Sequence, residues 1–241
     1  MLRISIFIVL LLSLSACKTK QNEKKVPIKI AFIADVHLQD IFPKFQDNNY
    51  PGIKNPKTGE YANIRTMSSQ LHSTRIFNEN YFAFLEALND ISKRGIKQVV
   101  LPGDFSDDGQ PVHVRGLRKI LEKYSKEKGI SFFVTTGNHD VVKPFAQEAV
   151  KTDFLGKDGK EQIISSSKTN FKKQENQLDP IITADIKNWG YKETLNEMGD
   201  FGFFPKKNYL YWETPFSDYK YEQYDFDKAL YVTSYEQVLH F

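Results

Sequence analysis

The sequence has little cysteine, little net charge and no glycine-rich nucleotide motif, and each shortage excludes a class of protein. Cys17 is the single cysteine among 241 residues, so a disulfide within the chain is impossible. The formal net charge is only +3 and is not gathered into a basic stripe, which gives no support for a nucleic-acid partner. No G-x-G-x-x-G motif follows the first strand-like run, which disfavours a Rossmann-like nucleotide binder. With 40% hydrophobic and 26% charged residues, the composition is that of a globular domain with one core.

The N-terminal segment has the order of a secretory signal. A basic residue precedes an apolar stretch from Ile4 to Leu14, which is too short to span a bilayer. The stretch ends in Leu14-Ser15-Ala16-Cys17, which resembles the bacterial lipobox, whose cysteine becomes an acylated N-terminus. We therefore expect a lipoprotein signal peptide over 1–17, lipid on Cys17 that anchors the protein to a membrane, and a polar tether over 18–27. By the same resemblance, Lys18 favours the outer membrane of a bacterial cell envelope. A cleaved signal with an incidental cysteine, or a short anchor, is the alternative.

Strand-like and helix-like patterns alternate through the first half of the chain. Short apolar runs at Ile28–Ala34, Val99–Leu101 and Phe132–Val134 are typical of strands covered on both faces. Between them, apolar residues recur at three- and four-residue spacing over 77–91 and 114–124, which predicts two amphipathic helices. The order β-α-β-α-β implies an α/β fold with a parallel sheet, whose polar functional groups gather at the carboxyl ends of the strands.

Three other segments do not fit this alternation. The stretch 39–74 is rich in Asn, Pro and Gly and is predicted to be a loop insertion over the site. The stretch Lys151–Asp179 is polar and charged, and is predicted to be linker-like. Aromatic residues are dense from Tyr209 to Tyr235, which indicates a packing surface or, alternatively, a face that stacks on substrate.

Polar side chains with metal-binding chemistry follow each of the three strands. Asp35 and His37 lie two apart after the first strand, so on an extended backbone both would point the same way and grip one divalent ion. Asp104 offers a carboxylate able to bridge two ions, and Asn138 offers an amide oxygen. Two neighbouring ions can activate a water for attack on phosphorus. His139 would then donate a proton to the leaving oxygen or stabilise the charge that develops there.

The motifs D-x-H, G-D-x-x-D and G-N-H-D, in this order and each after a strand, are similar to those of the calcineurin-like metallophosphoesterase superfamily. The motifs fall between Ile28 and Asp140, and the resemblance implies an αββα sandwich over 28–241. It also implies the following roles: Asp35 and His37 bind the first metal, Asp104 bridges, Asn138 binds the second metal, His139 is the catalytic imidazole, and Asp107 orients it.

The chain departs from this superfamily in two respects. Asp108 stands where the Ser/Thr protein phosphatases of the superfamily carry arginine, so that branch is disfavoured. The superfamily also closes its metal sites with a further histidine and a G-H-x-H segment, whereas His240 is the only histidine after His139. His72 and His113 are expected to be locally bonded or solvated. With few strand-like runs after Pro144, we expect a truncated chain in which only the N-terminal half of the sandwich is complete.

The resemblance implies hydrolysis of a phosphate ester by a hydroxide that two metal ions activate. The ions would be divalent or trivalent manganese, iron or zinc, and the partners a phosphate-ester substrate and, through the lipid, a membrane. The missing histidine ligands leave open whether the chain is active by itself. The alternative is an envelope lipoprotein that keeps the scaffold and binds a ligand or partner without catalysis. The substrate and the oligomeric state remain open at this point.

Overall fold

The centre of the molecule is a three-stranded parallel sheet in the order β1-β4-β5. A computed structural model describes residues 27–204 and 206–207. The three strands are β1 (Ile30–Phe32), β4 (Gln98–Pro102) and β5 (Ser131–Thr135). Each neighbouring pair is parallel, with Ala31 opposite Val99 and Val99 opposite Phe132. The predicted α/β class and the parallel sheet are therefore confirmed.

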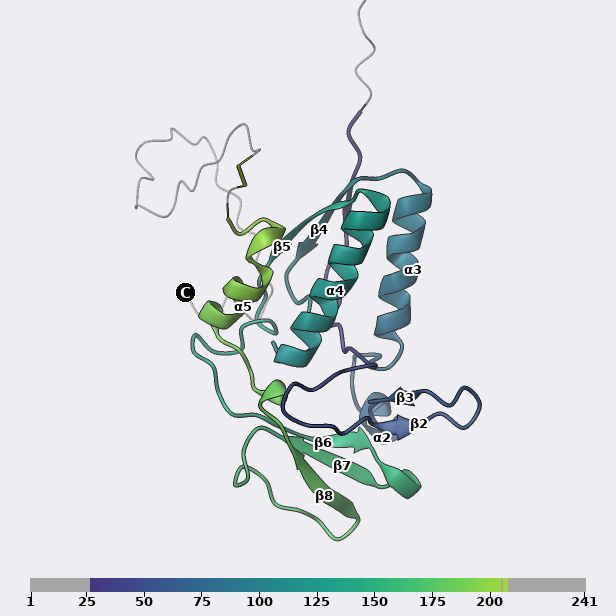
Figure 1. Ribbon diagram of the computed structural model, residues 1–241, viewed down its shortest axis with the longest axis vertical. Helices are drawn as coiled ribbons and strands as arrows, with labels where there is room; N and C mark the ends of the chain where they lie inside the picture. The colour runs from purple at the N-terminus through teal and green to yellow at the C-terminus, as the bar shows by residue number, and fades with distance from the viewer. Residues whose placement is uncertain (1–26, 205, 208–241) are drawn as a thin grey trace, which may run out of the picture.

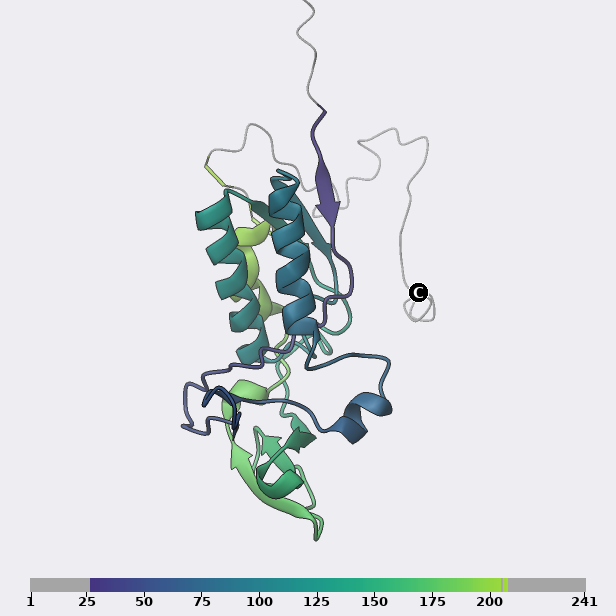
Figure 2. The ribbon, with the colours of Figure 1, turned by 90° about the vertical axis from the view of Figure 1, so that its right-hand side faces the viewer.

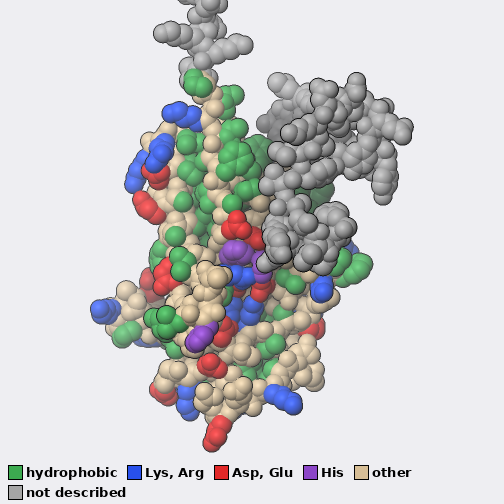
Figure 3. Space-filling view, turned by 180° about the vertical axis from the view of Figure 1, so that it is seen from behind, with side chains coloured by type: hydrophobic (Ala, Val, Ile, Leu, Met, Phe, Trp, Pro, Cys, Tyr) green, Lys and Arg blue, Asp and Glu red, His purple; other side chains and the backbone are tan. Residues whose placement is uncertain are grey.

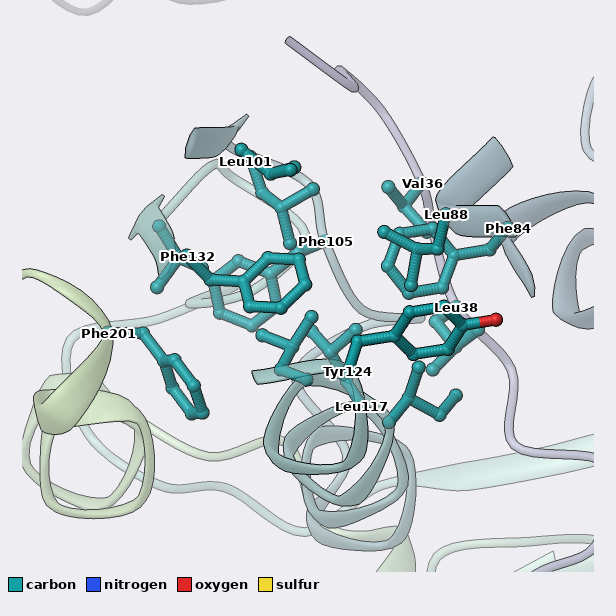
Figure 4. Packing of buried hydrophobic residues seen from close by; sticks show 14 of the residues in the cluster. Val36, Leu38, Phe84, Leu88, Leu101, Phe105, Leu117, Tyr124, Phe132 and Phe201 are labelled. Carbon is teal, nitrogen blue, oxygen red and sulfur yellow. The ribbon is translucent and has the colours of Figure 1, made fainter. Parts of the chain in front are cut away.

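Two long helices cover one face of this sheet, as Figures 1 and 2 show. They are α3 (Asn80–Lys93) and α4 (Pro111–Lys128), and both arise from the predicted apolar periodicity. Helix α4 begins with a proline at a position that needs no amide hydrogen, and it ends at Gly129, whose φ of 63° is the left-handed conformation that suits a C-cap. The apolar faces of both helices and the inward residues of the sheet form the main core, drawn in Figure 4: Phe84, Leu88, Leu101, Leu117, Tyr124 and Phe132 are among its buried members.

The opposite face of the sheet carries exposed apolar side chains within the described residues. Ile30 is 51% exposed and Phe32 is 68% exposed. The expected aromatic segment 209–235, the signal peptide with Cys17, and the tether as far as residue 26 lie outside the described residues. Across 27–204 and 206–207, no helix has the length and hydropathy that a membrane crossing requires.

The predicted insertion has some regular structure of its own. It contains the antiparallel pair β2 (Ile53–Lys54) and β3 (Tyr61–Ala62), followed by the short helix α2 (Met67–Leu71). The hydroxyl of Thr66 caps α2 by accepting a hydrogen bond from the amide of Ser69. In both ribbon views β2, β3 and α2 lie below the main sheet, at the carboxyl ends of its strands. They lie next to a second sheet.

The segment Lys151–Asp179 is not linker-like, which corrects the sequence analysis. It contributes to β6 (Val150–Leu155), β7 (Glu161–Ser165) and β8 (Gln177–Ile182), with the short helical turn η1 (Lys157–Gly159) between the first two. Strand β7 pairs antiparallel with β6 and parallel with β8. Phe154 of β6 and Ile163 and Ile164 of β7 are fully buried. Charged residues separate them along the chain, so the period-2 signal of a half-buried strand is weak.

The last described elements pack back onto the main core. They are η2 (Ala184–Ile186), α5 (Tyr191–Met198) and η3 (Gly199–Phe201). Helix α5 lies against α4, and Met198 and Phe201 are buried in the same cluster as the residues of α3 and α4. Arg118 of α4 strengthens this contact through a 2.8 Å ion pair with Asp200.

A buried arginine joins the insertion, the turn after β4, and β6. Arg65 is 2% exposed, and its Nη2 donates to Asp107 Oδ2 at 2.8 Å while its Nε donates to Gln39 Oε1 at 2.7 Å. Its Nη1 pairs with Asp153 of β6. The guanidinium also lies 4.2 Å from the ring centroid of Phe154. Because every side of the cation is occupied, its desolvation is offset by charge and hydrogen bonds.

Replacing Arg65 with methionine should lower the free energy of unfolding by about 3 to 5 kcal/mol, since Asp107 and Asp153 would lose the cation that both contact. Chemical denaturation of the two proteins measures the difference. Arg94→Met is the matched control, because that side chain is 67% exposed in its ion pair with Asp90 and should matter by less than about 1 kcal/mol. Equal losses in both variants would contradict the role given to Arg65.

Candidate metal centre

The turns that follow β1 and β4 bring three potential metal ligands together. Asp35, His37 and Asp104 each offer one ligand atom, and these atoms lie within 4.8 Å of one another. Backbone hydrogen bonds hold the two turns side by side, from the amide of His37 to the carbonyl of Asp104 at 2.7 Å and from Leu38 to Phe105 at 3.0 Å. The predicted convergence at the strand ends is therefore present for these three residues.

The backbone at these ligands differs from the sequence expectation. Strand β1 ends at Phe32, and Asp35 and His37 have φ angles of 54° and 43° rather than extended values. Asp104 has a φ of 48° as well. A left-handed conformation costs a non-glycine residue about 1 to 2 kcal/mol. Three such residues at one site indicate that the surrounding fold imposes the ligand geometry.

The imidazole of His37 fits a metal ligand. Its Nδ1 is buried and has no hydrogen-bond partner among the described residues, and its Nε2 lies 3.9 Å from Asp104 Oδ2. Burial, followed by the nearby charge of Arg75, lowers the pKa of His37, so the ring stays neutral and keeps a lone pair. Two carboxylates and one neutral imidazole are a donor set suited to zinc, manganese or iron. The residues present therefore fit a metal ion.

The turn after β5 supports Asp104 from the other side. The amide of His139 donates to Asp104 Oδ1 at 2.8 Å. A Cβ atom on Gly137 would overlap the same oxygen, so only glycine allows this approach. Asn138, the predicted ligand of a second ion, is exposed on this turn. The structure thus places Asn138 next to the backbone contact that holds Asp104.

Asp140 ties the two turns together, a role that the sequence analysis did not assign. Its buried carboxylate accepts hydrogen bonds from the amides of Phe105, Ser106 and Gly137, at 3.2, 2.8 and 2.9 Å, and from the Ser106 hydroxyl at 2.8 Å. Burial raises the pKa of Asp140 to about 7, while these donors act in the opposite direction. The final Asp of the G-N-H-D motif is the signal from which this could have been predicted.

The carboxylate that contacts His139 is Asp108, whereas the sequence analysis assigned that role to Asp107. His139 Nδ1 lies 2.7 Å from Asp108 Oδ1, and the hydrogen bond to Asp108 raises the pKa of the ring. Asp107 is instead buried between two guanidinium groups, those of Arg65 and Arg75. The φ of 55° at Asp108 turns its side chain back toward the histidine. The pair of cations that draws Asp107 inward is thus the physical reason for the difference.

Two basic side chains, Arg75 and Lys151, contact the acidic residues beside His139. Neither was predicted from the sequence. Arg75, in the turn between α2 and α3, donates from Nη1 to Asp107 Oδ1 at 2.7 Å, and its Nη2 lies 2.8 Å from His139 Nδ1 and 2.9 Å from Nε2. Lys151 of β6 pairs with Asp108 Oδ2. Figure 3 shows histidine, acidic and basic side chains gathered at the centre of one face.

The imidazole of His139 lies between the metal ligands and the basic side chains. Its ring centroid is 5.0 Å from that of His37, with an angle of 74° between the ring planes. The other histidines have different surroundings. His72 is exposed, with Nδ1 2.8 Å from the carbonyl of Ser68, and His240 lies outside the described residues. His113 is buried, and its Nδ1 accepts a hydrogen bond from the amide of Asp40 at 2.9 Å.

Comparison with known families agrees with this geometry. The model of the family described as calcineurin-like phosphoesterase matches residues 28–233, which is most of the chain. The chain therefore belongs to that family of metal-dependent hydrolases. No curated protein matches the sequence significantly.

His113 should make the protein less stable in acid. Burial lowers the pKa of this imidazole from 6.5 to about 3, so below pH 6.5 the unfolded chain takes up a proton that the native state refuses. Stability from this group is complete above pH 6.5 and is lost as the pH falls toward 3. By about pH 5 the loss should reach about 2 kcal/mol.

Denaturation of wild type and His113→Asn at several pH values measures this effect. Asparagine keeps an acceptor for the amide of Asp40 but does not titrate, so the difference in unfolding free energy isolates the imidazole. A difference that stays constant from about pH 7 to about pH 5 would contradict the prediction.

Proposed function

We propose that this protein hydrolyses a phosphate ester with the help of bound metal ions. The observation that carries the proposal is the cluster of Asp35, His37 and Asp104, whose ligand atoms lie within 4.8 Å of one another, beside the imidazole of His139. The family supplies the class of reaction. Manganese, iron and zinc are the candidate metals because each accepts oxygen and imidazole donors.

The ligands divide between two ions in this proposal. Asp35, His37 and Asp104 would hold the first ion, and Asp104 with Asn138 would contribute to the second. When bound, such ions activate a water for attack on phosphorus and neutralise charge on the phosphoryl oxygens. The two acidic side chains have no arginine or lysine paired with them among the described residues, so a metal cation would also balance their charge.

His139 is the proton donor to the leaving oxygen in this mechanism. Because a carboxylate only accepts hydrogen bonds, Nδ1 carries the hydrogen that faces Asp108, and Nε2 remains for the substrate. The hydrogen bond to Asp108 raises the pKa of the ring and so favours its protonated, donating form. As the bond between phosphorus and the leaving oxygen breaks, the proton from Nε2 neutralises the departing alkoxide.

Asp104→Asn should reduce hydrolysis of a generic aryl phosphate by at least about 100-fold and lower the metal content per chain. Asparagine can still accept the hydrogen bond from the His139 amide, so the fold should survive. Asp158→Asn is the matched control, since Asp158 is an exposed aspartate whose φ of 57° is also left-handed. Activity that is indifferent to Asp104→Asn would refute the assignment, and metal binding without any turnover in the wild type would favour the non-catalytic alternative.

We further propose that the enzyme is a lipoprotein of a bacterial cell envelope, held by lipid on Cys17, with the outer membrane favoured. The support is the order of basic residue, apolar stretch and Leu-Ser-Ala-Cys at the N-terminus. Cys17→Ser should abolish labelling by a radioactive fatty acid and move the protein from the membrane fraction to the soluble fraction. A membrane fraction that is unchanged in this variant would show that Cys17 is not the anchor.

A further inference from the structure

Three basic side chains surround the paired acids Asp107 and Asp108, and they differ in what they can reach. Arg65 is 2% exposed and all three of its nitrogens have protein partners, so it is structural. Lys151 pairs with Asp108. Only Arg75, whose side chain is 19% exposed, reaches the imidazole of His139. Arg75 is therefore the cation in a position to meet a molecule that contacts His139.

The guanidinium of Arg75 is held in place before any ligand arrives. Asp107 accepts from Arg75 through Oδ1 at 2.7 Å and from Arg65 through Oδ2 at 2.8 Å, so each carboxylate oxygen fixes one arginine. The ring of Phe77 lies below both cations, 5.1 Å from Arg65 Cζ and 5.9 Å from Arg75 Cζ. A side chain fixed in this way loses little entropy when it binds a further group.

The contact between Arg75 and His139 is one that an anion can replace. Nη2 lies 2.8 Å from Nδ1 and 2.9 Å from Nε2, and because Nδ1 carries the hydrogen that faces Asp108, Nε2 is the nitrogen whose lone pair is open to the guanidinium. A phosphoryl oxygen is charged and accepts from guanidinium about twice as strongly as a neutral group. Transfer of the Nη2 hydrogen bond to such an oxygen would free the Nε2 lone pair to take up a proton from solvent, which the proposed mechanism then delivers to the leaving oxygen.

We propose that Arg75 binds a nonbridging oxygen of the phosphate ester, and that Asp107 is the positioning residue that aims it. This inference rests on the proposed phosphoesterase function and adds the residue that recognises the phosphoryl group. Arg75 lies one residue after the predicted insertion 39–74, in the turn that follows α2, so this part of the chain would supply a residue that binds substrate. The motif at the turn after β4 lacks an arginine, and the chain supplies this cation from a different segment.

The test is the binding of inorganic phosphate by the full chain, measured by calorimetry with and without Mn²⁺. Arg75→Gln should weaken phosphate binding by about 10- to 100-fold, the range expected when one hydrogen bond to a charged group is lost. Mn²⁺ affinity should not fall, because Arg75 contacts none of Asp35, His37 and Asp104 and the loss of its positive charge removes repulsion from the metal site. Arg94→Gln, an exposed arginine at the end of α3, is the control and should bind phosphate as the wild type does.

Two further measurements keep the inference separate from the fold and from the proposed function. Arg75→Lys keeps a cation beside Asp107 but loses the planar fork, so it should recover only part of the phosphate affinity. The double variant Arg75→Gln with Asp107→Asn removes the carboxylate that would lose Arg75, while the amide oxygen can still accept from Arg65, and it should bind phosphate as weakly as Arg75→Gln. If the wild type binds phosphate but hydrolyses no ester, the proposed function fails while the role of Arg75 stands. Phosphate affinity that is unchanged in Arg75→Gln, or no phosphate binding by the wild type, would overturn the inference.

Discussion

One buried carboxylate, Asp107, determines much of the geometry on the basic side of the site. Its two oxygens each accept a guanidinium, from Arg65 at 2.8 Å and from Arg75 at 2.7 Å. A buried carboxylate without such partners would be strongly destabilised in its charged form. The same two cations connect Asp107 to Asp153 of the second sheet and to His139 of the β5 turn. The insertion, the main sheet and the second sheet are therefore held in one arrangement by a network of charge-assisted hydrogen bonds.

The site separates its charges into two regions with His139 between them. On one side, Asp35 and Asp104 gather with His37 in a region that suits a metal cation. On the other side, acids and bases are paired, with Asp108 joined to Lys151 and Asp107 to the two arginines. The imidazole is 5.0 Å from the ring of His37 and within hydrogen-bond distance of Arg75. With a metal cation bound by Asp35, His37 and Asp104, a substrate between these regions would meet positive charge from both, which is the arrangement that a phosphate ester requires.

The sequence predicted the metal side better than the basic side, and physical reasons account for the difference. Asp35, His37 and Asp104 follow neighbouring parallel strands, whose carboxyl ends must meet, so order along the chain was enough to bring them together. Whether Asp107 or Asp108 contacts His139 depends on the left-handed φ of Asp108 and on the cations that lie near Asp107. Neither feature is visible in a local sequence pattern. Arg75 is brought to the site by the folding of the segment around α2, and no local sequence pattern indicates that position. The strands β6 to β8 were missed because charged residues interrupt their few buried positions.

The spacing of the ligands along the chain sets when metal can bind during biosynthesis. Asp35 and Asp104 come from strands separated by a whole helix, and the glycine turn that supports Asp104 comes only after a second helix. A nascent chain that has not yet reached the end of β5 has Asp35, His37 and Asp104 but neither Asn138 nor the His139 amide that holds Asp104, so it would bind metal more weakly than the folded protein. Because sheet pairing between distant strands must precede the site, metal loading would follow folding of the α/β core rather than guide it.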